Sequence, residues 1–190
     1  MNILAIECSC HQGSVAALKN DVITGTWEFE SPRGRGTEYF THLEAALSQN
    51  PETDLVIVGT GPGSYNGLRM AISSAWGVAR ARGAKLAGVS SLLGYDAPEY
   101  FIAGDARANQ WFIAHVANGA FLSRPALVSP QEAQNGLLPG IPVFATSGLK
   151  GLEAIVAPPR AAILARRNFV EGVPEPLYLK APHITKPAGA

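Results

Sequence analysis

Short apolar runs, separated by polar breaks, fill the first third of the chain. Residues 2–8, 13–18 and 22–29 are strand-length segments rich in apolar side chains, and Asn20-Asp21 separates the last two as a turn. Residues 54–58 form a continuous apolar run, which is typical of a strand buried on both faces. The pattern therefore predicts a meander of three strands, followed later by a buried strand.

Helical periodicity appears in the two segments that flank this buried strand. Residues 37–48 place apolar side chains at helical spacing, and Asn50-Pro51 ends the segment. Residues 67–82 form the second helix, and residues 85–89 form another short strand. A meander followed by alternating helices and strands predicts a mixed sheet covered by helices.

The second half of the chain shows a less regular pattern. We expect a loop at 31–36 and a Pro-rich, extended tail, with a domain boundary that divides the chain into 1–97 and a smaller unit, 98–190. Ser129 and Glu132 have the spacing of a capping box that begins a short helix. The further predicted elements are strands at 100–104, 110–117 and 142–146 and helices at 149–156 and 159–169.

Composition limits the classes of protein to be considered. Hydrophobic residues make up 47% of 190 residues, which is enough for a core, and the formal net charge is zero. A neutral chain does not match a nucleic-acid binder that works alone, because phosphate contacts need clustered Lys and Arg. The N-terminus lacks the pattern of a signal peptide and no apolar run is long enough to cross a membrane, so we expect a cytoplasmic protein.

Catalytic and metal-binding patterns are missing from the sequence. His11, His42, His115 and His183 are scattered, with no HExxH motif and no GxSxG elbow. Cys8 and Cys10 are read as packing thiols, although a metal site with His11 is the alternative. We therefore predict no catalytic residue, no metal site and no cofactor.

The Gly-rich stretch GTGPGSYNG joins the buried strand to the second helix. Such a loop can cradle a phosphate with backbone N–H groups at a helix N-terminus. However, it lacks the Lys-Ser/Thr ending of a P-loop and the spacing of GxGxxG. We favour a structural turn, whose key residues are Gly61, Pro62, Gly63 and Ser64.

The helix at 67–82 has small residues every four positions. This small-residue ridge lets another backbone approach closely, and it consists of Gly67, Ala71, Ala75 and Ala79. Leu68, Ile72 and Trp76 form an adjacent apolar stripe, so the helix is either a central core helix or the contact for a partner. Arg69 lies in the first turn, where the helix dipole disfavours a cation, so we expect a carboxylate, a carbonyl or a partner to hold it.

A known family shares these motifs. The stretch GPGSYNGLRMAISSAWGVARARGAKLAGVSSL is similar to the pattern GPGSFTGLRIGLATAKGLA, followed by a strand and SSL, of the TsaB-type family. The opening MNILAIECSCHQGSVAAL resembles the family's ILAIDTST and SVAL segments. GDARANQWFIAHV and PEPLYLKAP resemble its DAR segment and its PxYLR ending. The similarity is strong over the first ninety residues, partial over 105–116 and weak elsewhere.

The resemblance implies an α/β, actin-like fold of the sugar kinase/Hsp70 type, with two lobes of mixed sheets flanked by helices. It also implies a non-catalytic subunit that activates a catalytic TsaD-type paralogue in making N6-threonylcarbamoyladenosine at position 37 of tRNA. An ATPase of the TsaE type joins that complex, homodimers use much the same surface, and tRNA is reached indirectly. Glu7 stands where the family has Asp, and Cys8-Ser9-Cys10 replaces Thr-Ser-Thr, so the nucleotide loop that contains Glu7 and Ser9 reads as degenerate.

The implied contact surface lies on the two helices of the first lobe. The expected partner-binding residues are Tyr39, Phe40, Leu43, Leu47, Gly67, Leu68, Arg69, Ala71, Ile72, Ala75, Trp76 and Ala79. Two alternatives stay open at this point. One is a small actin-like phosphotransferase that binds nucleotide at the 59–67 loop, and the other is a stand-alone homodimer.

Overall fold

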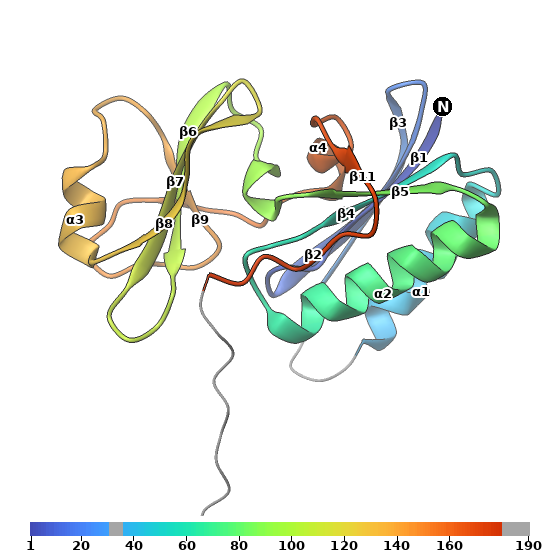
Figure 1. The fold of residues 1–190 in the computed structure, drawn as a ribbon, viewed down its shortest axis with the longest axis horizontal. Coiled ribbons are helices and arrows are strands. Elements are labelled where there is room, and N and C mark those ends of the chain that lie inside the picture. Colours follow the sequence, from blue (N-terminus) through green and yellow to red (C-terminus); the bar gives the residue numbers. More distant parts are fainter. Residues whose placement is uncertain (31–35, 180–190) are drawn as a thin grey trace, which may run out of the picture.

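The computed structural model describes residues 1–30 and 36–179. Two β-sheets lie side by side, each with helices packed against it (Figure 1). The predicted loop at 31–36, except for Gly36, and the end of the predicted tail lie outside these residues. In the described ranges, no helix is long and apolar enough to cross a membrane.

The first sheet has six strands in the order β11-β5-β4-β1-β2-β3. The predicted meander is β1 (Asn2–Glu7), β2 (Gln12–Lys19) and β3 (Val22–Glu30), with Asn20 and Asp21 at positive φ in the turn between β2 and β3. β4 (Leu55–Gly59) and β5 (Lys85–Val89) add in parallel on the other side of β1. β11 (Val170–Glu171), a strand that we did not predict, pairs antiparallel with β5.

The helices α1 (Thr37–Gln49) and α2 (Tyr65–Arg82) cover one face of this sheet. Their core side chains meet alternate strand residues such as Leu4, Ile6 and Val56. Asn50 caps the end of α1, as predicted, and Gly83 ends α2 in the left-handed conformation. α2 begins two residues before the predicted start, because the Ser64 hydroxyl caps it by accepting a hydrogen bond from the Gly67 N–H.

The second sheet repeats the strand order β5-β4-β1-β2-β3 of the first sheet, which leaves out only β11. Its order is β10-β9-β6-β7-β8, again an antiparallel meander followed by parallel strands. The short helix α3 (Pro130–Asn135) has the predicted capping box. The strands are β6 (Glu99–Asp105), β7 (Trp111–Ala117), β8 (Ala120–Val128), β9 (Val143–Ala145) and β10 (Ile155–Val156).

Three predictions for the second half were wrong or incomplete. Residues 149–156 are not a helix, because Ile155 and Val156 pair with β9 as β10. The helix predicted at 159–169 is only the one-turn α4 (Ala161–Leu164). The strand β8 and the 3-10 turn η1 (Ser91–Leu93) were not predicted.

The end of the chain returns to the first lobe. α4 packs on β1, β2 and β4, on the face of the first sheet that α1 and α2 do not cover. The same core includes Tyr100, Phe112 and Ala114 from the second lobe, so the two lobes share it. A division at residue 97 therefore separates the two meanders, while α4 and β11 belong to the first lobe's packing.

Candidate functional site: the Gly-rich loop and the outer helix face

The Gly-rich loop runs from the end of β4 to the start of α2 and is held by hydrogen bonds on one side. The Gly61 N–H donates to the Ser91 hydroxyl at 2.9 Å, and the Ser90 hydroxyl donates to the Gly61 carbonyl at 2.9 Å. The peptide bond between Gly61 and Pro62 is cis. These contacts fix the loop against the segment that follows β5.

The turn between β1 and β2 covers the other side of the loop. The Ser64 N–H donates to the Ser9 carbonyl at 2.7 Å. A Cβ on Gly63 would lie 2.0 Å from that same carbonyl oxygen, and a Cβ on Gly67 would lie 2.2 Å from the Cys8 carbonyl oxygen. Only glycine permits such an approach. The protein's own carbonyl groups thus occupy the N-terminal end of α2, where a phosphate cradle requires free N–H groups.

Glu7 is fully buried at the end of β1. Its Oε1 accepts a hydrogen bond from the Ser9 N–H at 2.5 Å, whereas Oε2 has no hydrogen-bond partner among residues 1–30 and 36–179. Burial raises the pKa of this carboxyl above its ordinary value of 4.5, although hydrogen bonds from Ser9 and Ser91 oppose the shift. Burial thus disfavours the ionised form of Glu7, which is the form that Mg²⁺ prefers as a ligand.

Two thiols lie near this carboxyl, of which Cys8 is buried and Cys10 is half-buried. Burial raises the pKa of Cys8 well above its ordinary value, with a smaller contribution from the Glu7 charge. The Cys10 thiol donates to the Gln12 carbonyl, and burial raises its pKa to about 12. Such thiols stay protonated and unreactive. Within the described ranges, no three His, Cys, Asp or Glu side chains gather as a metal site would require.

The histidines occupy separate places. The ring of His42 stacks on Phe29, and the ring of His115 stacks on Phe101 while Nε2 lies 2.8 Å from Glu99 Oε1. His11 is exposed in the β1–β2 turn, and His183 lies outside the described residues.

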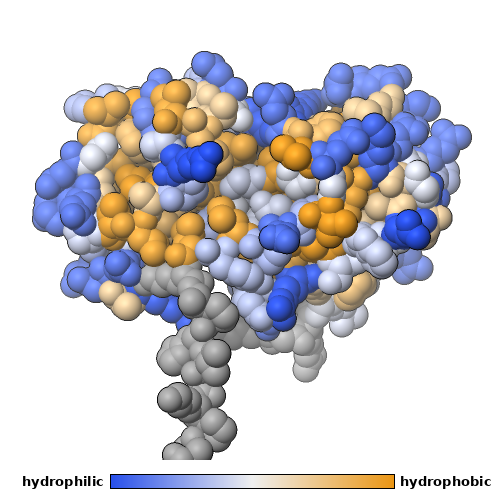
Figure 2. Space-filling view, in the orientation of Figure 1, coloured by the Kyte–Doolittle hydropathy of each residue, from blue (hydrophilic) through white to orange (hydrophobic). Residues whose placement is uncertain are grey.

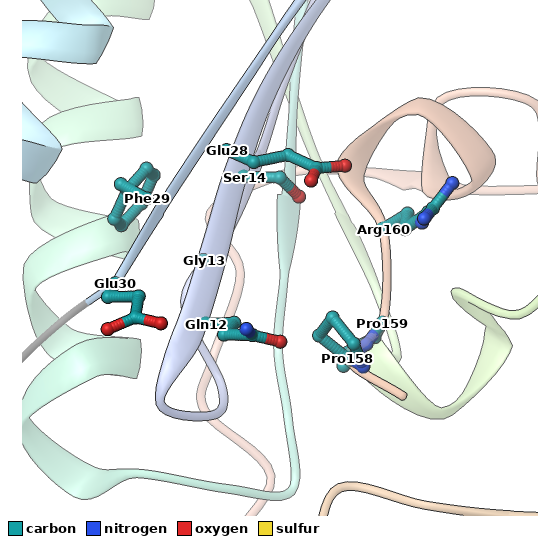
Figure 3. A pocket seen from close by; sticks show the side chains of 9 residues that line it. All are labelled: Gln12, Gly13, Ser14, Glu28, Phe29, Glu30, Pro158, Pro159 and Arg160. Atoms are coloured by element: carbon teal, nitrogen blue, oxygen red, sulfur yellow. The ribbon is translucent and has the colours of Figure 1, made fainter. Parts of the chain in front are cut away.

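A groove lies between the β2–β3 hairpin and the chain that leads into α4 (Figure 3). It consists of two adjoining cavities of about 190 and 370 Å³. Figure 3 shows Glu28 and Ser14 on one wall, facing the segment of Arg160, while Phe29 points away. Glu28 and Glu30 both line the first cavity, and two carboxylates would repel the phosphates of a nucleotide.

The expected partner surface is only partly accessible, because the small-residue ridge faces the protein's own sheet. Ala71, Ala75 and Ala79 belong to the core that packs on β1 and β4. A protein partner cannot touch these side chains without unfolding the lobe. The buried members of the expected set are Tyr39, Leu43, Leu68, Ala71, Ala75 and Ala79. Gly67, Leu47 and Ile72 are half-buried.

The accessible part consists of side chains that point away from the sheet. On α2, the exposed residues recur at helical spacing as Arg69, Ser73, Trp76 and Arg80, with Gly77 beside them. On α1, Phe40 is 52% exposed, and Trp76 on α2 is 49% exposed. A hydrogen bond between the hydroxyl groups of Tyr39 and Ser74 ties the two helices together. We call the set Phe40, Arg69, Ser73, Trp76, Gly77 and Arg80 the outer helix face.

Arg69 has a different partner from those expected. Its guanidinium carbon lies 4.4 Å from the ring centroid of Tyr65, one turn earlier on α2. The ring of Tyr65 in turn stacks on that of Tyr178, with centroids 5.4 Å apart. Sequence reasoning missed both tyrosines, although the PEPLYLKAP ending, which contains Tyr178, was the available signal.

Comparisons with known proteins agree with this architecture. The family model for TsaD, tRNA N6-adenosine threonylcarbamoyltransferase, matches residues 41–114. The fold is similar to that of YeaZ from Pseudomonas aeruginosa, with a TM-score of 0.69 and 22% identity over 94% of this chain and 99% of that chain. A second structure, of a protein with similarity to peptidase YeaZ from the same organism, has a TM-score of 0.71 at 22% identity and the same coverage. The predicted α/β fold, with two mixed sheets flanked by helices, is confirmed.

Two groups of curated relatives are uncharacterised mycobacterial proteins. The one from Mycobacterium leprae is 31% identical over 140 residues, which are 69% of this chain and 39% of that protein. The one from Mycobacterium tuberculosis is 29% identical over 152 residues, which are 73% of this chain and 69% of that protein. The chain thus spans well under half the length of the first relative.

Proposed function

We propose that this chain is a TsaB-type protein, the non-catalytic partner subunit in tRNA N6-threonylcarbamoyladenosine synthesis; the motifs shared with that family, the match of residues 41–114 to the TsaD family model and the fold support this. In this role it binds and activates a catalytic TsaD-type paralogue. A TsaE-type ATPase joins the complex, and the chain contacts tRNA only through the paralogue. In the absence of the paralogue, two copies of the chain form a homodimer through the same surface. The family match supports a role connected with tRNA modification.

The observation that supports a binding role most strongly is the outer helix face. Two large aromatic side chains, Phe40 and Trp76, are each about half exposed on neighbouring helices that are otherwise well packed. Trp and aromatic residues are enriched where protein interfaces gain most of their energy. Gly77 has no atom within 4 Å of where its Cβ would lie, so it leaves room for a partner's backbone.

A catalytic role for this chain has less physical support than a binding role. The carbonyl groups of Cys8 and Ser9 cover the start of α2, and Glu7 is buried with its pKa raised above the ordinary value. A phosphotransferase would need free N–H groups for phosphate and ionised oxygen ligands for Mg²⁺. We therefore propose that this chain has no catalytic activity of its own.

Co-purification tests the binding role. The tagged full-length chain is expected to retain the TsaD-type paralogue of the same organism, and Trp76→Glu or Phe40→Glu is expected to abolish retention, because a buried unpaired charge is costly. Leu122→Glu is the matched control, since Leu122 is 63% exposed on β8 of the second lobe. Retention of the paralogue by both helix variants would overturn the proposal.

A further inference from the structure

The chain after β11 lies along the edge of the first sheet and reaches the start of α2 (Figure 1). We call residues 172–179 the C-terminal strap. It begins where the Gly172 N–H donates to the Leu86 carbonyl at 2.9 Å. The strap contains no helix or strand, so individual contacts hold it in place.

These contacts concentrate on the Gly-rich loop. Pro174 is buried, and a Cβ on Gly88 would lie 2.9 Å both from Pro174 and from Thr60. The Leu177 N–H donates to the Thr60 carbonyl at 2.8 Å. A cavity of about 230 Å³ lies between the strap and the residues Thr60 and Gly88. The strap is therefore anchored at two points, with incomplete packing between them.

The last contact is the one that reaches the outer helix face. Tyr178 stacks on Tyr65 with an interplanar angle of 29°, and Arg69 lies over the Tyr65 ring. Tyr65 is 43% exposed and Tyr178 is 39% exposed, so the stack stands at the surface rather than in the core. Aromatic and cation–π contacts of this kind restrict rotamers that would otherwise be free.

We propose that the C-terminal strap is a latch in which Tyr178, a positioning residue, fixes Tyr65 and Arg69 so that the outer helix face is ordered before its partner binds. This inference rests on the proposed function, because it concerns the same surface. An ordered surface loses less conformational entropy on binding. The affinity for the partner thus depends on the C-terminal strap, although Tyr178 itself lies outside α1 and α2.

Titration calorimetry of the full-length chain with the purified TsaD-type paralogue of the same organism tests the latch. We expect Tyr178→Ala to weaken the Kd by about three- to tenfold, as loss of an aromatic pair predicts. Tyr178→Phe keeps the ring and should bind within about twofold of the wild type. Leu177→Ala is the matched control in the same strap, since its N–H bond to Thr60 comes from the backbone.

Thermal unfolding and a double variant separate positioning from general stability. Tyr178→Ala and Leu177→Ala should show similar Tm values, whereas only the former changes the Kd. In the Tyr65→Ala background, Tyr178→Ala should weaken binding no further, because it acts through Tyr65. Wild-type affinity for Tyr178→Ala, equal weakening by Leu177→Ala, or additive effects in the double variant would overturn the latch.

The two proposals fail in different ways. If Trp76→Glu abolishes binding and Tyr178→Ala leaves it unchanged, the latch is wrong and the partner surface stands. If the paralogue does not bind the wild-type chain at all, the proposed function is wrong, and the latch, which rests on it, is overturned as well.

Discussion

The backbone N–H of Ser64, at the cap of α2, donates a 2.7 Å hydrogen bond to the carbonyl oxygen of Ser9, in the turn between β1 and β2. This bond holds the β1–β2 turn against the start of α2, where a phosphate cradle would need free N–H groups. Gly63 and Gly67 permit the approach because neither has a side chain. The closed junction makes the Gly-rich loop a structural turn between β4 and α2.

The first prediction concerns Mg-ATP. Because the start of α2 is covered, we expect isothermal titration of the full-length chain to show no saturable binding, with a Kd weaker than about 1 mM. Titration with Mg²⁺ alone corrects for heats of dilution and ion binding. A micromolar Kd would show that the β1–β2 turn opens, and it would revive the phosphotransferase alternative.

A pair of glycine substitutions on α2 tests the close approach directly. Gly67→Ala would place a Cβ 2.2 Å from the Cys8 carbonyl oxygen, so the backbone must shift. We therefore expect the free energy of unfolding to fall by about 1–3 kcal/mol. Gly77→Ala is the matched control, because no atom lies within 4 Å of its Cβ and Ala favours a helix over Gly by about 0.5–1 kcal/mol. Urea unfolding measures both. Equal effects of the two substitutions would contradict the packing described.

Glu7 makes the free energy of unfolding depend on pH, and the raised pKa fixes the direction of that dependence. Burial raises its folded-state pKa above 4.5, so the folded state binds more protons than the unfolded state once the pH exceeds that value. The free energy of unfolding should then fall as pH rises from 4.5 toward the folded pKa, by at most about 1.4 kcal/mol per pH unit.

Glu7→Gln keeps the shape of the neutral carboxyl and removes its titration. Denaturant unfolding at a series of pH values should show the variant gaining stability relative to the wild type as pH rises above 4.5. A difference that stays constant with pH would mean that Glu7 is ionised in the folded protein.

The sequence predicts the first lobe well because local pattern and tertiary packing agree there. The runs in β1, β2 and β4 are long and apolar, and each becomes a buried strand. In the second half of the chain, the local pattern and the tertiary packing disagree. β8 contains Ser123, Arg124 and Pro125, which interrupt any apolar pattern, and its strand conformation comes from pairing with β7.

The partner surface shows a second limit of sequence reasoning. A ridge such as Ala71-Ala75 permits close approach, yet the spacing does not say whether the approaching backbone is the protein's own sheet or another subunit. Here the sheet takes that place. The large residues that the structure exposes, Phe40 and Trp76, were in the predicted set, but the sequence could not separate them from their buried neighbours Tyr39 and Ala75.

Reconstitution of threonylcarbamoyl transfer tests the central claim most directly. Purified TsaD-type paralogue, TsaE-type ATPase and tRNA are supplied with threonylcarbamoyl donor, with and without this chain, and modified adenosine is measured over time. We predict that modification requires the wild-type chain and is lost with Trp76→Glu but not with Leu122→Glu. Modification at the same rate without the chain would contradict the proposal that it is the activating subunit.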